Sequence, residues 1–305
     1  MKPPRWAFIV LAAFVGVASS MGHALGAPPA GSGLRSSSPG LRLINVSTTL
    51  YFPDIRRSGP CSAAPPNAYA GGPVYQFDQD NPVRPAYNHA DKNLALRSYA
   101  AVNEFKGFVH YTQDDPTVPP QFATFFSPNR VPAFPAVYRA NTWAWQPSPN
   151  PGSPGSPITD PPVSVLGLAV TPGEALHVPA SGYDIGGGME VIVLYADADS
   201  IALKYTREDS VAPNGYTVHV DGLCTDPNLL ALYSQLDAPN GPRYVYRGPA
   251  DRVTDYNLPS LAAGQVFGVA RGAEIQVAIV DSGAFVDPRN CTEWWRIRPG
   301  HPNCP

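Results

Sequence analysis

The second half of the chain carries a series of apolar and alternating segments of strand length. Residues 163–170 and 189–195 are almost continuously apolar, which is typical of strands buried on both faces. Residues 201–205 and 216–220 alternate apolar and polar positions, which predicts half-buried strands. Residues 274–280 alternate in the same way. The pattern therefore predicts a mainly β region.

One helix is predicted within this region. Asp226 is a favourable N-cap residue, and Pro227 stands at the first helical position. The apolar residues that follow have helical spacing: Leu229, Leu232, Tyr233 and Leu236. We therefore expect a β domain with one short helix over residues 163–298, followed by a polar tail over 299–305.

Two stretches rich in Pro, Ser and Gly divide the rest of the chain. They cover residues 27–40 and 146–162 and contain too few apolar residues to pack against a core. Between them, residues 41–145 carry short apolar runs that are interrupted by prolines. This pattern predicts two β-rich regions joined by a linker, with the first one irregular.

The N-terminus has the pattern of a secretory signal peptide. Lys2 and Arg5 precede an apolar run over residues 6–18, and small residues suited to cleavage follow, so the signal is expected to cover residues 1–26. A retained N-terminal anchor is the alternative. No other stretch approaches 18 apolar residues, so no membrane span is expected after signal removal. We therefore expect a protein secreted to the extracellular space or the cell envelope.

Composition narrows the class of protein further. The 305 residues include 37 prolines and 27 glycines, which disfavours a helical bundle. Because 44% of the residues are hydrophobic and 10% aromatic, the chain can still build a core, and full disorder is excluded. Only 15% are charged and the net charge is −3, so no basic surface for nucleic acid is indicated.

The predicted secretion implies that the four cysteines form disulfide bonds. Cysteines in exported proteins usually form disulfides, and four of them allow three pairings. We favour Cys291–Cys304, which would tie down the C-terminal tail and leave Cys61–Cys224 to join the two halves of the chain. Two N-x-[ST] sequons offer possible glycosylation sites, at Asn45 and Asn290.

Four short motifs follow one another in the C-terminal half of the chain. They are GYDI (182–185), LYSQL (232–236), LPSLAAGQVFG (258–268) and EIQVAIVDSGAFVDP (274–288). In this order and rough spacing they are similar to motifs of the lysostaphin-like peptidases, which cut peptide cross-bridges in bacterial cell walls. The resemblance covers roughly a third of the chain and implies a lysostaphin-like β domain in the C-terminal region.

The sequence departs from that family at the zinc site. The positions that correspond to the family's zinc ligands are Ala180, Asp184 and Gln276, and those of its two other catalytic histidines are Gln235 and Glu274. A hydrolytic zinc site needs three protein ligands and an open position for water. The resemblance therefore implies a degenerate member, with no zinc or other cofactor and no catalytic residues at this site.

The same residues would line a polar cleft if the resemblance holds. In the family fold the cleft would be formed by Asp184, Gln235, Glu274 and Gln276. Such a cleft suits hydrogen bonding to an extracellular glycan or a cell-wall peptide, and the alternative is a solvated surface that binds nothing. Four tryptophans offer either a sugar-stacking face or core packing: Trp143, Trp145, Trp294 and Trp295.

The sequence thus favours a secreted, non-enzymatic binding or structural module. The alternative is an active hydrolase of cell-wall peptide or glycan that uses other residues. The candidates for such a site are His89 with Asp91, or His219 beside Asp221. His219 falls on the polar face of its alternating segment, which predicts contact with solvent. A third alternative is a purely structural glycoprotein.

Overall fold

The computed structural model describes residues 61, 67–78, 85–111, 116–147, 150–239, 241–244 and 256–300. All of them belong to the compact unit of residues 53–305. The predicted signal peptide, the linker over 27–40, the sequon at Asn45, and Cys304 with its predicted bond to Cys291 lie outside the described residues.

The prediction of a mainly β protein is confirmed, with 36% of the described residues in strands against 11% in helices. The strands are β1 (Ala70–Val74), β2 (Tyr99–Ala101), β3 (Val137–Ala144), β4 (Ser153–Pro157), β5 (Val165–Ala169), β6 (Ala175–His177), β7 (Val191–Ala196), β8 (Ser200–Lys204), β9 (Tyr216–Asp221), β10 (Leu223–Thr225), β11 (Tyr256–Leu261), β12 (Val266–Ala270), β13 (Glu274–Asp281) and β14 (Ala284–Val286). The α-helices are α1 (Leu94–Arg97) and α2 (Pro227–Leu236), and short 3-10 helices cover Ala86–Asn88, Phe122–Phe125 and Pro242–Tyr244.

The strongest sequence patterns correspond to observed elements. The predicted strands appear as β5, β7, β8, β9 and β13, and the predicted helix is α2. The Asp226 side chain caps α2 by accepting hydrogen bonds from the backbone N–H of Asn228 at 2.8 Å and Leu229 at 3.4 Å. These bonds satisfy two donors that the first helical turn leaves without partners, so the helix begins where the sequence predicts.

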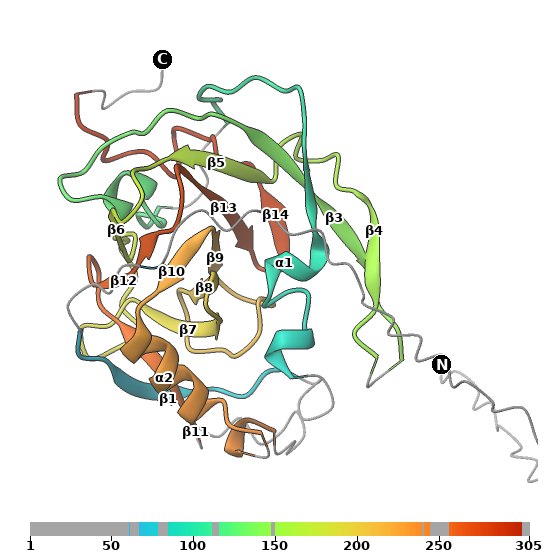
Figure 1. The fold of residues 1–305 in the computed structure, drawn as a ribbon, viewed down its shortest axis with the longest axis vertical. Helices are drawn as coiled ribbons and strands as arrows, with labels where there is room; N and C mark the ends of the chain where they lie inside the picture. Colours follow the sequence, from blue (N-terminus) through green and yellow to red (C-terminus); the bar gives the residue numbers. More distant parts are fainter. Residues whose placement is uncertain are drawn as a thin grey trace, which may run out of the picture. The chain divides into compact units, whose positions relative to one another are not determined.

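The strands form two antiparallel sheets in the described part of the chain. The larger sheet has the order β1-β11-β7-β8-β9-β13-β5-β3-β2, with β14 paired to β13 and β4 paired to β3. Figure 1 shows β5, β13, β9, β8 and β7 in succession through the middle of the view. A smaller sheet has the order β10-β12-β6, and α2 packs against β7 and β11.

The two regions that the sequence analysis separates contribute to the same sheet. Strand β1 pairs with β11, and β3 pairs with both β2 and β5. The Pro-rich segment over 146–162 also contains a strand, β4, which pairs with β3 along one side. Because proline cannot donate a backbone hydrogen bond, Pro154 and Pro157 are compatible with an edge strand of this kind. The Pro-rich composition of residues 146–162 therefore does not mark a boundary between two separate regions.

The central strands are buried on both faces. On β13, Ile275, Val277 and Ile279 belong to the main hydrophobic core, whereas Ala278 belongs to a smaller cluster on the opposite face. Leu94 of α1 completes that smaller cluster, and α1 lies against β9. This cover explains why β9 is fully buried, although its alternating sequence predicts a half-buried strand. Strand β8 is also fully buried.

The four tryptophans divide between core and surface. Trp294 and Trp295 are fully buried, and their indole nitrogens donate to the backbone oxygens of Asp287 at 2.8 Å and Pro288 at 3.0 Å. Trp145 is 42% exposed and its ring lies 6.2 Å from that of Trp143. Trp294 and Trp295 are therefore core residues and do not form a sugar-stacking face.

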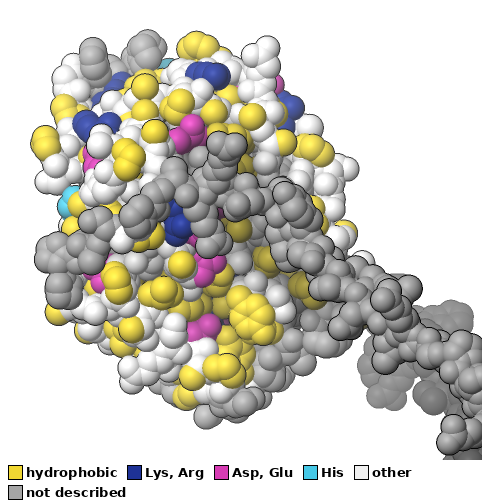
Figure 2. All heavy atoms as spheres, in the orientation of Figure 1, with side chains coloured by type: hydrophobic (Ala, Val, Ile, Leu, Met, Phe, Trp, Pro, Cys, Tyr) yellow, Lys and Arg dark blue, Asp and Glu magenta, His cyan; other side chains and the backbone are white. Residues whose placement is uncertain are grey.

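The disulfide Cys61–Cys224 is present, as favoured from the sequence, and joins positions 163 residues apart. No helix among the described residues is long and apolar enough to cross a membrane. The face seen in Figure 2 carries basic and acidic side chains scattered singly among hydrophobic and uncharged ones. This distribution agrees with the low share of charged residues in the sequence.

Candidate functional site

The candidate site lies on the less apolar face of the central strands. Alternate residues of a strand point to the same face, so Glu274, Gln276 and Ala278 of β13 share one face. Gln276 is paired with Asp221 of β9 on one side and with Gly167 of β5 on the other. The register therefore brings Asp221 and Gln276 next to each other, with Glu274 two positions further along β13.

Glu274 is held by two hydrogen-bond donors from different strands. Its Oε1 accepts a hydrogen bond from the hydroxyl of Tyr138 on β3 and another, at 3.0 Å, from the amide of Gln276. Gly167 leaves the space for this arrangement, because a Cβ at that position would lie 2.3 Å from Glu274 Oε1. The Glu274 carboxyl group therefore has a defined position on the sheet.

Asp221 is the most perturbed carboxyl of this face. Its Oδ2 accepts a hydrogen bond from the Tyr99 hydroxyl at 3.2 Å, and its side chain is 7% exposed. Its Oδ1 is buried with no hydrogen-bond partner among the described residues. Burial raises the pKa of Asp221 to about 7, and the nearby charges of Asp197 and Asp199 act in the same direction.

Tyr99 and Tyr138, which donate hydrogen bonds to Asp221 and Glu274 respectively, are in contact with each other. The rings of Tyr99 and Tyr138 lie edge to face, with centroids 5.4 Å apart. Burial, together with the hydrogen bond to Glu274 and its charge, raises the pKa of Tyr138 to about 12, and burial beside Asp221 raises the pKa of Tyr99 further. Both phenols therefore remain protonated donors at neutral pH. We call this group the carboxyl–tyrosine cluster, and it consists of Tyr99, Tyr138, Asp221, Glu274 and Gln276.

His219 lies on the same face of β9, two residues before Asp221. It is 2% exposed, which contradicts the prediction of a solvated side chain; the α1 segment covers this part of the sheet. Burial and the charge of Arg97 lower the pKa of His219 to about 3. The imidazole is therefore neutral at physiological pH, and it borders the carboxyl–tyrosine cluster as an uncharged group.

The structure places the four predicted cleft residues in three locations. Glu274 and Gln276 are hydrogen-bonded to each other. Asp184 is exposed, and its Oδ1 accepts a hydrogen bond from the backbone N–H of Gly186 at 2.6 Å. Gln235 is exposed on α2, the helix that packs against β7 and β11.

The register indicates how far Asp184 lies from the cluster. The ring of the adjacent Tyr183 lies 5.8 Å from that of Tyr216, at the start of β9. Tyr216 pairs with Asp281, whereas Asp221 pairs with Gln276 five residues along the strand. Five residues of strand span about 16 Å. Asp184 therefore belongs to the opposite end of β9 from the cluster.

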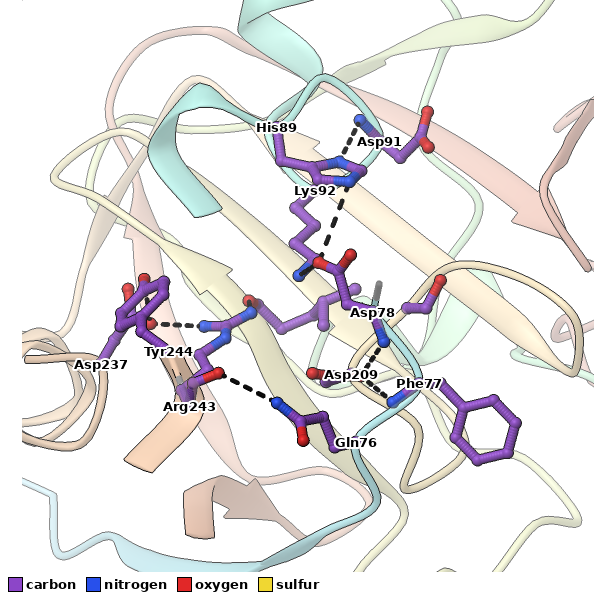
Figure 3. A network of polar contacts seen from close by, with 12 residues as sticks. Gln76, Phe77, Asp78, His89, Asp91, Lys92, Asp209, Asp237, Arg243 and Tyr244 are labelled. Atoms are coloured by element: carbon purple, nitrogen blue, oxygen red, sulfur yellow. Dashed lines mark hydrogen bonds and ion pairs between the residues drawn. The ribbon is translucent and has the colours of Figure 1, made fainter. Parts of the chain in front are cut away.

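The other candidate pair for a hydrolase site, His89 with Asp91, belongs to a separate polar network, which Figure 3 shows. His89 Nδ1 accepts a hydrogen bond from the backbone N–H of Asp91 at 3.3 Å, so the two side chains are not a hydrogen-bonded pair in that contact. On the other side of the ring, His89 Nε2 lies 3.9 Å from Asp78 Oδ2, and the ammonium of Lys92 binds the same oxygen.

The remainder of this network fixes the backbone after β1. Asp209 is fully buried, and its Oδ1 accepts hydrogen bonds from the backbone N–H of Phe77 at 2.6 Å and of Asp78 at 2.8 Å. Its Oδ2 accepts a hydrogen bond from the Tyr256 hydroxyl at 2.6 Å. These bonds fix the backbone at Phe77 and Asp78, and the Asp78 side chain lies beside Lys92.

The predicted glycosylation site Asn290 is buried. Its side chain is 3% exposed, and its amide nitrogen donates to Glu293 Oε2 at 2.9 Å. A glycan would be attached through that nitrogen, so the folded geometry disfavours glycosylation there. Among the described residues, no group of three or more His, Cys, Asp and Glu side chains is arranged to hold a metal ion.

Comparison with known proteins gives no relative: the chain matches no family model, no curated protein and no solved structure. The resemblance to the lysostaphin-like peptidases therefore stays a prediction from its four motifs. Of the carboxyl–tyrosine cluster, sequence reasoning names Glu274 and Gln276 as cleft residues and Asp221 as the neighbour of His219. Tyr99 and Tyr138 were missed, because they come from the region that has no recognisable motif.

Proposed function

We propose that this protein is a secreted, non-catalytic binding module that recognises a polar glycan or peptide of the cell envelope. The observation that carries the proposal is the carboxyl–tyrosine cluster. It combines half-buried Tyr99, Tyr138, Glu274 and Gln276 with a buried carboxyl whose Oδ1 has no hydrogen-bond partner among the described residues.

The chemistry of the cluster favours a ligand rich in hydroxyl or amide groups. The half-buried carboxyl of Glu274 accepts hydrogen bonds from sugar hydroxyls or peptide N–H groups, and the Gln276 amide both donates and accepts. The rings of Tyr99 and Tyr138 offer apolar faces suited to a sugar ring or a peptide side chain. The predicted signal peptide and the disulfide Cys61–Cys224 support an oxidising compartment outside the cytosol, where such ligands occur.

One observation favours a second function, hydrolysis of the same class of ligand. Asp221, with its pKa raised to about 7, is protonated below neutral pH, and Glu274 lies diagonally across the strand pair. Diagonal neighbours on a sheet have Cβ atoms about 7 Å apart, which leaves the two carboxyl groups close enough to act on one bond. An acid with a raised pKa beside a second carboxylate is the pair that glycoside hydrolysis uses.

A single experiment separates the two functions. The secreted protein is titrated with purified cell-wall peptides and amino-sugar oligosaccharides, and each recovered ligand is examined by mass spectrometry. The binding module predicts saturable binding with the ligand recovered intact. Cleavage that falls away as the pH rises through about 7, and is lost in Asp221→Asn, would instead establish the hydrolase. Absence of binding to every class of ligand would contradict both.

A further inference from the structure

Asp78 and Lys92 form a buried contact that lies outside the carboxyl–tyrosine cluster and plays no part in the proposed binding function. Both side chains are removed from water, with Asp78 6% and Lys92 1% exposed. The ammonium of Lys92 binds Asp78 Oδ2, and His89 Nε2 lies 3.9 Å from that same oxygen. Figure 3 shows the three side chains directed toward one another, with Lys92 and His89 on the same side of Asp78.

The backbone holds these three groups in place from two directions. Asp78 is positioned by its N–H, which donates to Asp209 Oδ1 at 2.8 Å. Lys92 and His89 belong to one turn, in which the Lys92 N–H donates to the His89 carbonyl at 2.9 Å. Nucleophile, carboxyl and imidazole therefore approach one another without any change in the fold, which is the condition for an efficient intramolecular reaction.

From this geometry we propose that Asp78 and Lys92 become joined by an isopeptide bond, with His89 as the proton relay. The reaction begins with the transfer of one proton from the Lys92 ammonium to the Asp78 carboxylate along the contact between them, which gives a neutral amine and a carboxylic acid. The neutral amine is the nucleophile that the reaction needs.

The reaction is a condensation that needs no other reactant. The electron pair of Lys92 Nζ forms a bond to Asp78 Cγ, and one Cγ–O bond of the carboxyl breaks. The leaving oxygen departs as water, carrying the proton of the carboxylic acid and one proton that Nζ loses. The product is a secondary amide between the two side chains, and no atom changes its oxidation state.

His89 is suited to moving the proton. Its Nδ1 accepts a hydrogen bond from the Asp91 N–H at 3.3 Å, which places a ring proton on Nε2, the nitrogen that faces Asp78. Nε2 gives this proton to the leaving oxygen and recovers one from Nζ. The distance of 3.9 Å is longer than a hydrogen bond, and such contacts commonly shorten only as the reaction proceeds.

Peptide mapping tests the proposal on the wild-type protein. The folded, secreted protein is denatured, reduced and digested with trypsin together with chymotrypsin, which cuts after Tyr87 and so opens the chain between Asp78 and Lys92. The proposal predicts that the two fragments stay joined, with a combined mass lower by one water molecule, and that trypsin does not cut after Lys92. Separate fragments of full mass from the wild-type protein would overturn it.

Two variants identify the participating residues. Lys92→Arg keeps the positive charge of the ion pair but cannot form the amide, so its fragments are expected to separate at full mass. His89→Gln removes the proton relay and is expected to slow bond formation roughly a hundredfold, so freshly purified protein remains largely unlinked. Linkage in Lys92→Arg would show that another pair is joined and would overturn the assignment. Undiminished linkage in His89→Gln would overturn the role of His89.

Discussion

Tyr138 on β3 donates its hydroxyl hydrogen bond to Glu274 on β13, across the intervening strand β5 and across 136 residues of sequence. The contact joins the Pro-rich first half of the chain to the strand that carries the family resemblance. It also sets the position of the carboxylate in the carboxyl–tyrosine cluster. The candidate site is therefore a product of both halves of the chain.

Removal of this hydrogen bond is expected to destabilise the protein. Tyr138→Phe leaves Glu274 with the Gln276 amide as its remaining donor in the cluster. A hydrogen bond to a charged group contributes about 1.5–3 kcal/mol, and partial exposure reduces that value, so we expect a loss of about 1–2 kcal/mol in the free energy of unfolding. Urea denaturation measures it. Tyr87→Phe is the matched control, because Tyr87 is 58% exposed, and its stability is expected to equal that of wild type.

The buried carboxyl of Asp221 makes stability depend on pH. Its pKa rises from about 4 in the unfolded chain to about 7 in the folded protein. Between these values the folded state binds more protons than the unfolded state, so the contribution of Asp221 falls as the pH rises from 4 to 7. Asp221→Asn removes this dependence, and it is expected to be more stable than wild type at pH 8, by an amount on the order of 1 kcal/mol or more.

His219 has the opposite effect over nearly the same range. Its pKa falls from about 6.5 in the unfolded chain to about 3 in the folded protein, so the unfolded state binds more protons between these values. Its contribution to stability therefore increases as the pH rises from 3 to 6.5. Denaturation midpoints measured from pH 4 to pH 8 are expected to rise with pH in Asp221→Asn and to fall with pH in His219→Gln. Parallel profiles in the two variants would contradict the burial of these groups.

Gly167→Ala tests the position of the Glu274 carboxylate without removing any polar group of the cluster. A Cβ at this position would approach Glu274 Oε1 to 2.3 Å, so Gly167→Ala requires the carboxylate to move. The added Cβ would also lie 3.0 Å from the backbone oxygen of Ala136. Because displacing the carboxylate breaks its hydrogen bond with Tyr138, we expect a stability loss of about 1–2 kcal/mol, as for Tyr138→Phe. Ligand affinity is expected to fall roughly tenfold, since the carboxylate no longer points toward Tyr138. Unchanged affinity with a displaced Glu274 would remove this carboxylate from the site.

Local patterns in the sequence predict much of the second half of the fold. The strands β5, β7, β8, β9 and β13 follow from apolar runs or alternation, and α2 follows from its cap and helical spacing. The pairing of distant strands cannot be predicted in this way, because the hydrophobic period and the composition of a segment do not tell which strand it pairs with. The strand within residues 146–162 illustrates this point: a Pro-rich segment was expected to be a linker, but it pairs with β3 as an edge strand.

The candidate site could be predicted only in part for the same reason. Glu274 and Gln276 share a face through the two-residue period of a strand, so the sequence suffices to place them together. The partners of this pair, Tyr99 and Tyr138, come from strands whose position in the sheet depends on long-range pairing. The burial of His219 has a similar origin, because the α1 segment that covers it lies more than a hundred residues earlier in the chain.

The most direct test of the proposed binding function compares two acidic residues. An envelope-derived glycan or peptide that binds the wild-type protein is titrated calorimetrically into Glu274→Gln, which alters the carboxyl–tyrosine cluster, and into Asp184→Asn, which alters the exposed loop before β7. We predict that Glu274→Gln weakens binding about tenfold or more and that Asp184→Asn leaves it unchanged. Wild-type affinity in Glu274→Gln, or a loss confined to Asp184→Asn, would contradict the account.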